Sequence, residues 1–234
     1  MWLGDSVELC ERFKPEVKAV DCIVTDPPFG VDNLSNQSVT PQGKAHARKI
    51  ANDESPEIAI DIFQRVMNVL LPKTADTSDA YVFTSYQVLR EWLTMLDAFM
   101  PDFGFHRKAV LVWEKDGPGM GDLECPWGMG SEFIMFFQRG RPEKKTKRRN
   151  SVIHVPQLRP NQLIHPHEKP TRLLEMLVKA STREGDFVVD PFGGSGSLVR
   201  AARQCNRNAV AIELDKENYL KAKQKLDEEE ESLL

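Results

Sequence analysis

The sequence predicts an α/β fold in which helices cover a mostly parallel, doubly wound sheet. Two observations carry this prediction. Short apolar runs typical of buried strands alternate with longer segments whose apolar residues recur at helical spacing. Two of the apolar runs also end in an acidic residue followed by a proline- or glycine-containing turn, as strands do at the ligand-binding edge of such sheets.

The predicted strands are short runs rich in β-branched or aromatic residues. The first, residues 21–26, ends in Asp26 and two prolines, and ladder pairing stops there because proline has no N–H to donate. Further strands are predicted at residues 79–84, 109–113, 132–138, 186–190 and 208–214. The runs 109–113 and 132–138 flank a glycine-rich segment, so we expect a strand and hairpin region at the sheet edge.

The predicted helices repeat apolar residues along one face. The first, residues 56–71, begins with the capping residue Ser55 and the first-turn Pro56, and its apolar positions then keep helical spacing. The same pattern predicts helices at residues 87–100, 170–182, 197–205 and 216–230.

Length and composition limit the possible classes of protein. With 234 residues, we expect a single domain spanning residues 1–234. No run approaches the roughly 18 apolar residues of a membrane span, and the first residues lack a signal-peptide pattern, so we expect a cytoplasmic protein. The four cysteines form no C-x-x-C pair, which predicts neither a zinc site nor a disulfide framework.

Charge is unevenly distributed, although the formal net charge is only −4. Five acidic residues lie together at 227–231, whereas residues 139–149 contain seven basic residues against one acid. Such a basic loop can contact phosphate or can be a solvated connection, and charge alone does not separate the two.

Three irregular stretches, near residues 30–53, 116–130 and 139–165, are longer than most connections in a compact domain. We therefore predict that they are functional loops.

The strongest signal for a ligand site is Asp190-Pro191-Phe192-Gly193-Gly194-Ser195-Gly196-Ser197, between a predicted strand and a predicted helix. Its glycines let the backbone approach a ligand, and the helix start offers free N–H groups. The segment lacks the dinucleotide fingerprint and the P-loop lysine, so it suits another nucleotide-like or zwitterionic cofactor unless it is an ordinary turn. Glu213 ends the next strand about 20 residues later, where an acid commonly binds ribose hydroxyls.

A second candidate is Asp26-Pro27-Pro28-Phe29, also at a strand end, so that the two segments can face one site. The Asp26 carboxylate beside carbonyls held by two prolines makes a rigid pair of acceptors, and the Phe29 ring can stack on a planar group. This arrangement suits an amino group on a flat heterocycle, although four such residues alone can also form a simple turn.

In combination, these motifs resemble those of the DNA amino-methyltransferases, which modify N6 of adenine or N4 of cytosine. The resemblance runs from Gly4-Asp5 through Asp26-Pro27-Pro28-Phe29 and His165-Pro166-His167-Glu168-Lys169-Pro170 to the glycine-rich segment and Ile212-Glu213-Leu214-Asp215. The catalytic motif precedes the cofactor motif, as in the circularly permuted β class of that family. The resemblance implies a Rossmann-like, S-adenosylmethionine-dependent methyltransferase fold.

The resemblance also implies roles for single residues. The catalytic residues would be Asp26, Pro27, Pro28 and Phe29. The S-adenosylmethionine site would be formed by Asp5, Asp26, Lys169, Asp190, Phe192, Gly194, Ser195, Gly196 and Glu213. Lys169 would lie near the cofactor carboxylate, the alternative being a surface lysine at a helix start. No metal is implied, because no cysteine or acid cluster accompanies His165 and His167.

For the substrate, the resemblance implies double-stranded DNA with the target base flipped out, in a restriction-modification setting. Asp26 favours adenine N6, because cytosine N4 enzymes usually carry serine there, and Phe29 replaces the commoner tyrosine. DNA contacts are expected in the loops, at Lys44, Arg48, Trp127, Lys147, Arg148 and Arg149. Trp127 could instead pack in a core, and a homodimer would add contact area.

Two alternatives stay open from the sequence. One is a cytosine N4 methyltransferase of the same fold, and the other is a non-catalytic DNA-binding protein that keeps the fold. Methylation of RNA or of protein amides is less favoured, because amide-modifying relatives typically carry asparagine where Asp26 stands.

Overall fold

The structure is a computed structural model that describes residues 1–14, 18–31, 50–117, 124, 126–143, 145–159, 163 and 168–231. The strands in these ranges are β1 (Trp2–Leu3), β2 (Val20–Thr25), β3 (Thr74–Thr84), β4 (Phe105–Glu114), β5 (Ser131–Arg139), β6 (Val152–His154), β7 (Phe187–Asp190) and β8 (Asn208–Glu213). The α-helices are α1 (Ser6–Glu11), α2 (Pro56–Leu70), α3 (Leu89–Phe99), α4 (Thr171–Ser181), α5 (Ser197–Gln204) and α6 (Lys216–Glu231).

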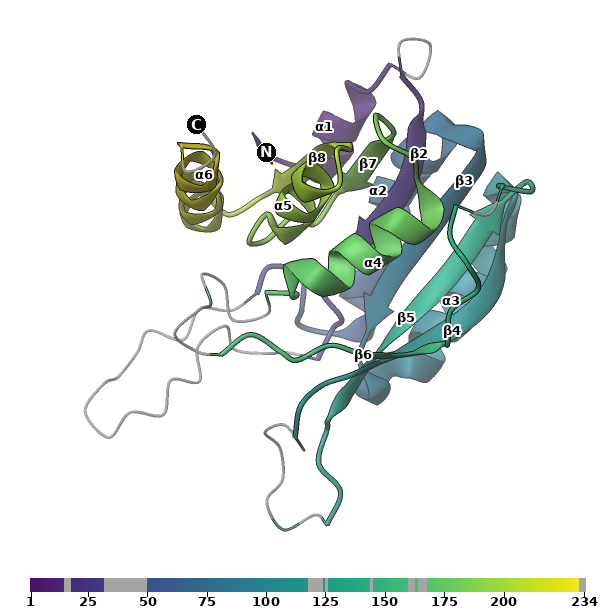
Figure 1. Ribbon diagram of the computed structural model, residues 1–234. Coiled ribbons are helices and arrows are strands. Elements are labelled where there is room, and N and C mark those ends of the chain that lie inside the picture. The colour runs from purple at the N-terminus through teal and green to yellow at the C-terminus, as the bar shows by residue number, and fades with distance from the viewer. Residues whose placement is uncertain are drawn as a thin grey trace.

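The described strands form one sheet in the order β1-β8-β7-β2-β3-β5-β4-β6 (Figure 1). Every neighbouring pair is parallel except β3–β5 and β5–β4, so β5 alone among them runs against the others. The predicted mostly parallel α/β fold is therefore confirmed.

Helices cover both faces of the sheet, each over its own apolar core. Side chains of α1, α2 and α3 pack on one face, whereas those of α4 and α5 pack on the other. Strand β2 serves both cores, because Ile23 points to one face while Cys22 and Val24 point to the other. The predicted helices are all present, with ends within two residues of the prediction.

Three short elements lie where no regular structure was predicted. Strand β1 and helix α1 are too short to show a period, and α1 depends on the Asp5 carboxylate, which accepts the N–H groups of Val7 (2.8 Å) and Glu8 (3.1 Å). Strand β6 lies inside the stretch expected to be an irregular loop, and it pairs with β4. The predicted β4–β5 hairpin pair is correct, but the edge position is wrong, because β6 is the outer strand.

The direction of the strands sorts the loops onto two edges of the sheet. The carboxyl ends of β1, β8, β7, β2, β3 and β4 share one edge with the start of the reversed strand β5. The loop after β5 and the turns before β7 and β8 lie at the opposite, amino edge. Both ends of the described chain lie near β1 and β8, where Met1 packs beside Leu226 of α6 (Figure 1).

Within the ranges that the structure describes, no helix combines the length and the apolar character needed to cross a bilayer.

Candidate active site

A cavity of about 570 Å³ opens at the carboxyl edge of the sheet. It lies where the neighbouring strands β7 and β2 end, from which the chain winds outward in opposite directions. Ligands of doubly wound sheets bind at such a switch point. The Asp26 loop and the glycine-rich segment after Asp190 both line this cavity, so the structure brings together the two motifs that the sequence singles out.

The Asp26 loop is held by contacts with its backbone. Asp53, just before α2, accepts the N–H groups of Phe29 (2.9 Å) and Gly30 (2.7 Å), and the indole N–H of Trp92 donates to the Phe29 carbonyl (3.0 Å). The Phe29 side chain lines the cavity, packs against both apolar cores and has the Lys169 ammonium 5.9 Å from its ring centroid. Asp53 and Trp92 were not found by the sequence reasoning, since neither belongs to a motif.

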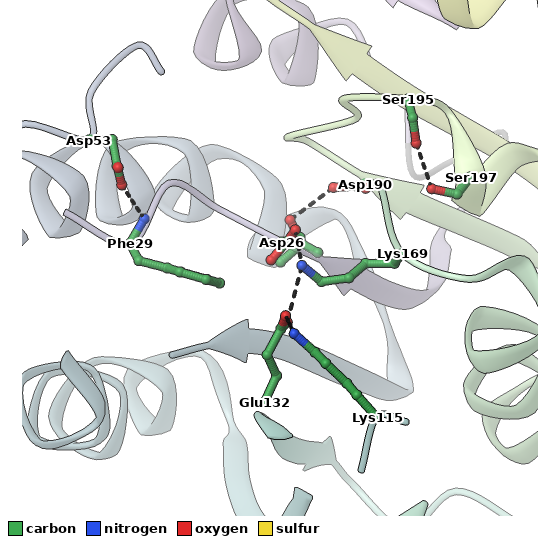
Figure 2. A network of polar contacts seen from close by, with 10 residues as sticks. Asp26, Phe29, Asp53, Lys115, Glu132, Lys169, Asp190, Ser195 and Ser197 are labelled. Carbon is green, nitrogen blue, oxygen red and sulfur yellow. Dashed lines mark hydrogen bonds and ion pairs between the residues drawn. The ribbon is translucent and has the colours of Figure 1, made fainter. Parts of the chain in front are cut away.

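Lys169 is buried beside Asp26, so its alternative reading as a surface lysine is wrong. Its side chain is 8% exposed, and Nζ lies 2.6 Å from Asp26 Oδ2 and 3.2 Å from Glu132 Oε2. Figure 2 shows the Lys169 ammonium between these two carboxylates. Lys169 therefore contacts the carboxylate of the predicted catalytic loop directly.

Glu132 and Lys115 continue this chain of alternating charges. Glu132 is the second residue of β5, Lys115 follows β4, and the Lys115 ammonium lies 2.5 Å from Glu132 Oε1 (Figure 2). Glu132 lines the cavity because β5 is reversed and starts at the carboxyl edge, and Lys115 meets it there because β4 ends at the same edge. The sequence reasoning missed them; the available signal was a charged residue at each end of the glycine-rich connection between two apolar runs.

Burial and these charges set the ionisation of the site. Burial raises the pKa of Asp26 to about 6, with Lys169 opposing the rise and Glu132 adding to it. Burial also acts to raise the pKa of Glu132, but Lys169 and Lys115 together bring it below its usual value. The pKa of Lys169 is raised, because the two carboxylates outweigh the desolvation that would lower it. At neutral pH the carboxyl groups of Asp26 and Glu132 are therefore ionised beside the Lys169 ammonium.

Two buried carboxylate oxygens of this network, Asp26 Oδ1 and Glu132 Oε2, have no hydrogen-bond partner among the described residues. Glu132 Oε2 still has the Lys169 ammonium at 3.2 Å, whereas in Asp26 it is the other oxygen, Oδ2, that accepts from Lys169. A buried acceptor without a donor costs roughly 1–3 kcal/mol, so a ligand N–H that reached Oδ1 would recover that free energy.

The glycine-rich segment is fixed by carboxylates at its two neighbouring strand ends. Asp190 Oδ1 accepts the Thr25 hydroxyl (2.9 Å) and the Phe192 N–H (3.0 Å), and burial raises the pKa of Asp190 to about 7. Glu213 accepts the N–H groups of Gly194 and Asp215, both at 2.8 Å, and burial raises its pKa.

Most of the predicted cofactor residues line the cavity, namely Asp5, Asp26, Lys169, Asp190, Phe192, Gly194, Ser195 and Glu213. Gly196 does not. A Cβ at Gly196 would lie 2.7 Å from Met1 Sδ and 3.5 Å from Ala222 and Leu226, so this glycine meets the chain ends rather than a ligand. Its φ of +70° makes it the turn before α5.

The residues predicted to contact DNA do not form one group in the described structure. Lys44 and Arg48 lie outside the described residues. Trp127 is 83% exposed, which excludes the alternative of a packed core tryptophan, and it belongs to the β4–β5 connection at the carboxyl edge.

Lys147, Arg148 and Arg149 are exposed, and their loop leaves from the amino edge. Arg149 borders a hollow together with Thr182 and Arg207, which precede β7 and β8. The nine residues of β5, roughly 30 Å, separate the start of this loop from the cavity, whereas its end leads into β6, where Ile153 pairs with Trp113, the partner of Glu132. Phosphate contact by these three residues stays a prediction.

His165 and His167 lie outside the described ranges. In the described part of the chain, no three or more His, Cys, Asp or Glu side chains cluster in a way that suits a metal ion.

Comparison with known proteins adds a family match. A family model for N6 and N4 methyltransferases, described as DNA methylase, matches residues 20–224. The chain is 25% identical to the type II methyltransferase M.HpaI of Haemophilus parainfluenzae, over 92% of this chain and 70% of that protein. It is 26% identical to the type II methyltransferase M2.DpnII of Streptococcus pneumoniae, over 98% of this chain and 90% of that protein.

Two solved structures share the fold. The M1.HpyAVI–SAM complex superposes with a TM-score of 0.70 at 22% identity, covering 96% of this chain and 97% of that one. The cytosine-N4-specific PvuII DNA methyltransferase superposes with a TM-score of 0.71 at 19% identity, covering 95% and 84%.

Proposed function

The chain belongs to the DNA methylase family of N6 and N4 methyltransferases, and from that premise we propose that it methylates N6 of an adenine flipped out of duplex DNA. Methyl transfer to an exocyclic amine of a DNA base is the activity of the family. The choice of adenine is supported by Asp26, because the resemblance of its loop is to the adenine-modifying members.

The observation that carries the proposal is the free oxygen of Asp26. With Oδ2 held by Lys169, Oδ1 is the acceptor left for a substrate amine, and the Pro27 carbonyl beside it is the second. Two accepted hydrogen bonds would draw the nitrogen lone pair out of conjugation with the ring and leave it available for methyl transfer. The arrangement requires an ionised Asp26, because a protonated carboxyl can neither balance the Lys169 ammonium nor offer both oxygens as acceptors.

The residues around the cavity fit S-adenosylmethionine, which when bound supplies an electrophilic methyl group on a sulfonium. Gly194 has open space where a side chain would begin, so the backbone can lie against a ligand there. Glu213 stands at the end of β8, where its carboxylate can accept ribose hydroxyls, and Asp5 lies on the same side of the cavity. We assign Asp190, Phe192 and Ser195 to the methionine end.

In this proposal the target base leaves the duplex and stacks on the Phe29 ring. The cavity lies at a sheet edge, so a base inside a duplex cannot reach Asp26 without leaving the stack, at a cost of a few kcal/mol. Stacking on an aromatic ring is worth about 1 to 3 kcal/mol, and the partly exposed Phe29 ring lies in the cavity wall. Trp127 is the candidate to contact the DNA left behind, and Lys44 and Arg48 are candidates for phosphate contact.

The direct test is analysis of nucleosides from DNA treated with the purified protein and labelled S-adenosylmethionine. N6-methyladenine is the expected product. Label in N4-methylcytosine would overturn the base assignment but not the family activity, and the cytosine-N4 specificity of the PvuII neighbour makes this the second candidate.

The role of Asp26 is tested by Asp26→Ala. Loss of transfer is expected, with cofactor binding still measurable by calorimetry. Substantial residual methylation would contradict the assigned role, and failure of the wild-type protein to bind the cofactor would favour a non-catalytic DNA-binding protein.

A further inference from the structure

The network at the cavity extends two residues beyond the motif residues. In order of contact, the charged side chains are Asp26, Lys169, Glu132 and Lys115, with separations of 2.6, 3.2 and 2.5 Å between successive charged atoms. The four side chains are 22%, 8%, 17% and 16% exposed in that order. Such pairs interact strongly because solvent screens them little.

The alternation of positive and negative charges determines how each side chain affects the Asp26 carboxylate. Lys169 is shared between two carboxylates, so its attraction is divided between Asp26 and Glu132. Lys115 neutralises Glu132 from the other side and limits how strongly Glu132 draws on Lys169. Asp190 on β7 is a further carboxyl group near Asp26, and its pKa of about 7 keeps it protonated while Asp26 titrates.

We propose that Glu132, held in place by Lys115, is a positioning residue that shares the Lys169 ammonium with Asp26 and so preserves the capacity of Asp26 to accept hydrogen bonds from a substrate amine. The assignment rests on the proposed function of Asp26 as the amine acceptor. Glu132 itself acts through Lys169 and is assigned no contact with the methyl donor.

If Asp26 and Glu132 share the Lys169 ammonium, replacing Glu132 and replacing Lys115 should shift the pKa of Asp26 in opposite directions. Glu132→Gln removes the competing carboxylate, so Lys169 is left to Asp26 alone and the pKa of Asp26 falls. Lys115→Met leaves Glu132 unbalanced and drawing more strongly on Lys169, so the pKa of Asp26 rises. Lys169→Met raises it further, because Asp26 then faces Glu132 without the ammonium nearest to it. If Glu132 and Lys115 were needed only for packing, removing the negative charge and removing the positive charge would not shift the pKa of Asp26 in opposite directions.

The first measurement needs no activity. Carbon-13 NMR of aspartate-labelled, cofactor-free protein, with the Asp26 carboxyl assigned by Asp26→Asn, follows the titration directly. The expected pKa in the wild-type protein is about 6, with shifts of about one unit down in Glu132→Gln and up in Lys115→Met. Glu175→Gln and Lys179→Met are matched controls, since that partly exposed pair on α4 lies outside the cavity, and they are expected to leave the titration unchanged.

The second measurement is the pH dependence of kcat/KM, which reports groups of the free enzyme. Its acidic limb is expected to follow the NMR shifts, with Glu132→Gln also lowering the rate at neutral pH several-fold because Asp26 becomes the weaker acceptor. Shifts in the same direction for both variants, or none, overturn the proposal even if the wild-type protein methylates DNA. If Glu132→Gln does not fold, Lys115→Met decides alone. A wild-type protein that fails to methylate DNA defeats the proposed function, whereas the NMR titration still decides the sharing of Lys169.

Discussion

At the scale of the residue, two carboxyl groups of the cavity resist ionisation for the same reason. Asp26 and Asp190 are both withdrawn from water at neighbouring strand ends, and burial is the largest cause of each raised pKa. They differ in their partners. Asp26 has an ammonium group at 2.6 Å, whereas Asp190 has only a hydroxyl and a backbone N–H. The fold therefore opposes ionisation of Asp190 more strongly than ionisation of Asp26.

This difference predicts a pH-dependent stability change for Asp190→Asn. The folded protein holds the Asp190 proton up to a pKa of about 7, against an ordinary value of 3.8, so wild-type stability falls as pH rises between these values and levels off above 7. Asparagine cannot ionise. The unfolding free energy of the variant, taken relative to that of the wild type, should therefore increase by up to about 2 kcal/mol between pH 5 and pH 7.

Urea denaturation across this pH range measures the effect. Asp61→Asn, at a highly exposed helix position, is the matched control and should show no such trend. A difference between Asp190→Asn and wild type that stays constant with pH would mean that Asp190 is ionised in the folded protein at pH 5.

At the scale of the element, the loop after β2 depends on a glycine as much as on its motif residues. Gly30 has φ of +84°, and a Cβ there would lie 2.3 Å from the Pro56 nitrogen at the start of α2. The backbone of Gly30 also donates to Asp53. The loop and the start of α2 therefore approach each other more closely than any side chain would permit.

Gly30→Ala is accordingly expected to displace the Asp26 loop and to lower kcat/KM at least tenfold. Gly185→Ala separates the two causes, because Gly185 has a similar φ of +82° but open space around its Cβ position. The control should lose about 1 kcal/mol of stability from backbone strain alone while keeping its activity. Equal loss of activity in both variants would show that contact with Pro56 is not the cause.

Helix α1 depends on a residue distant in sequence, which binds the free carbonyls at the end of this short helix. The Lys73 ammonium donates to the carbonyls of Cys10 (2.7 Å), Glu11 (2.6 Å) and Phe13 (3.0 Å), at and just after the end of the helix. A cation at a helix carboxyl end satisfies free carbonyls and interacts favourably with the helix dipole.

Lys73→Met should therefore lower the unfolding free energy by about 1–2 kcal/mol, which chemical denaturation can measure. Lys108→Met, at an exposed strand position, provides the comparison and should change it by less than about 0.5 kcal/mol. An equally small change in both variants would mean that solvent replaces the Lys73 contacts without cost.

At the scale of the whole molecule, two sets of basic residues are candidates for phosphate contact. Residues 31 and 50, which flank the segment containing Lys44 and Arg48, lie at the carboxyl edge, Val31 packed on the apolar core and Ile50 in the cavity wall. The loop containing Lys147, Arg148 and Arg149 starts from the amino edge and ends at β6, and Arg149 borders the hollow beside Thr182 and Arg207. DNA placed to deliver a base to Asp26 lies against the first edge.

The salt dependence of DNA binding tests which set contacts the DNA. Changing both Lys44 and Arg48 to glutamine should flatten the slope of log K against log salt by up to about two, one for each lost phosphate contact. Changing Lys147, Arg148 and Arg149 together removes more charge but should flatten the slope less. A larger effect of the triple variant would place the DNA along the basic loop and contradict the arrangement inferred from the edges.

The sequence by itself determined the order of strands and helices, the permuted arrangement of motifs and the residues of the two cavity loops. These are local properties, because periodicity, capping residues and glycine or proline turns are visible in neighbouring residues. Single elements that need a partner, such as β1, α1 and β6, were not visible, since none is long enough to show a period.

The tertiary structure alone decided which charges meet. Asp26, Lys115, Glu132 and Lys169 are separated by up to 143 positions between partners, and only the reversal of β5 and the packing of the segment before α4 bring them into one chain. The structure also removed Gly196 from the cavity wall and moved the start of the basic loop to the opposite edge. Burial and long-range pairing depend on how distant strands align, and for that reason no local pattern in the sequence could specify them.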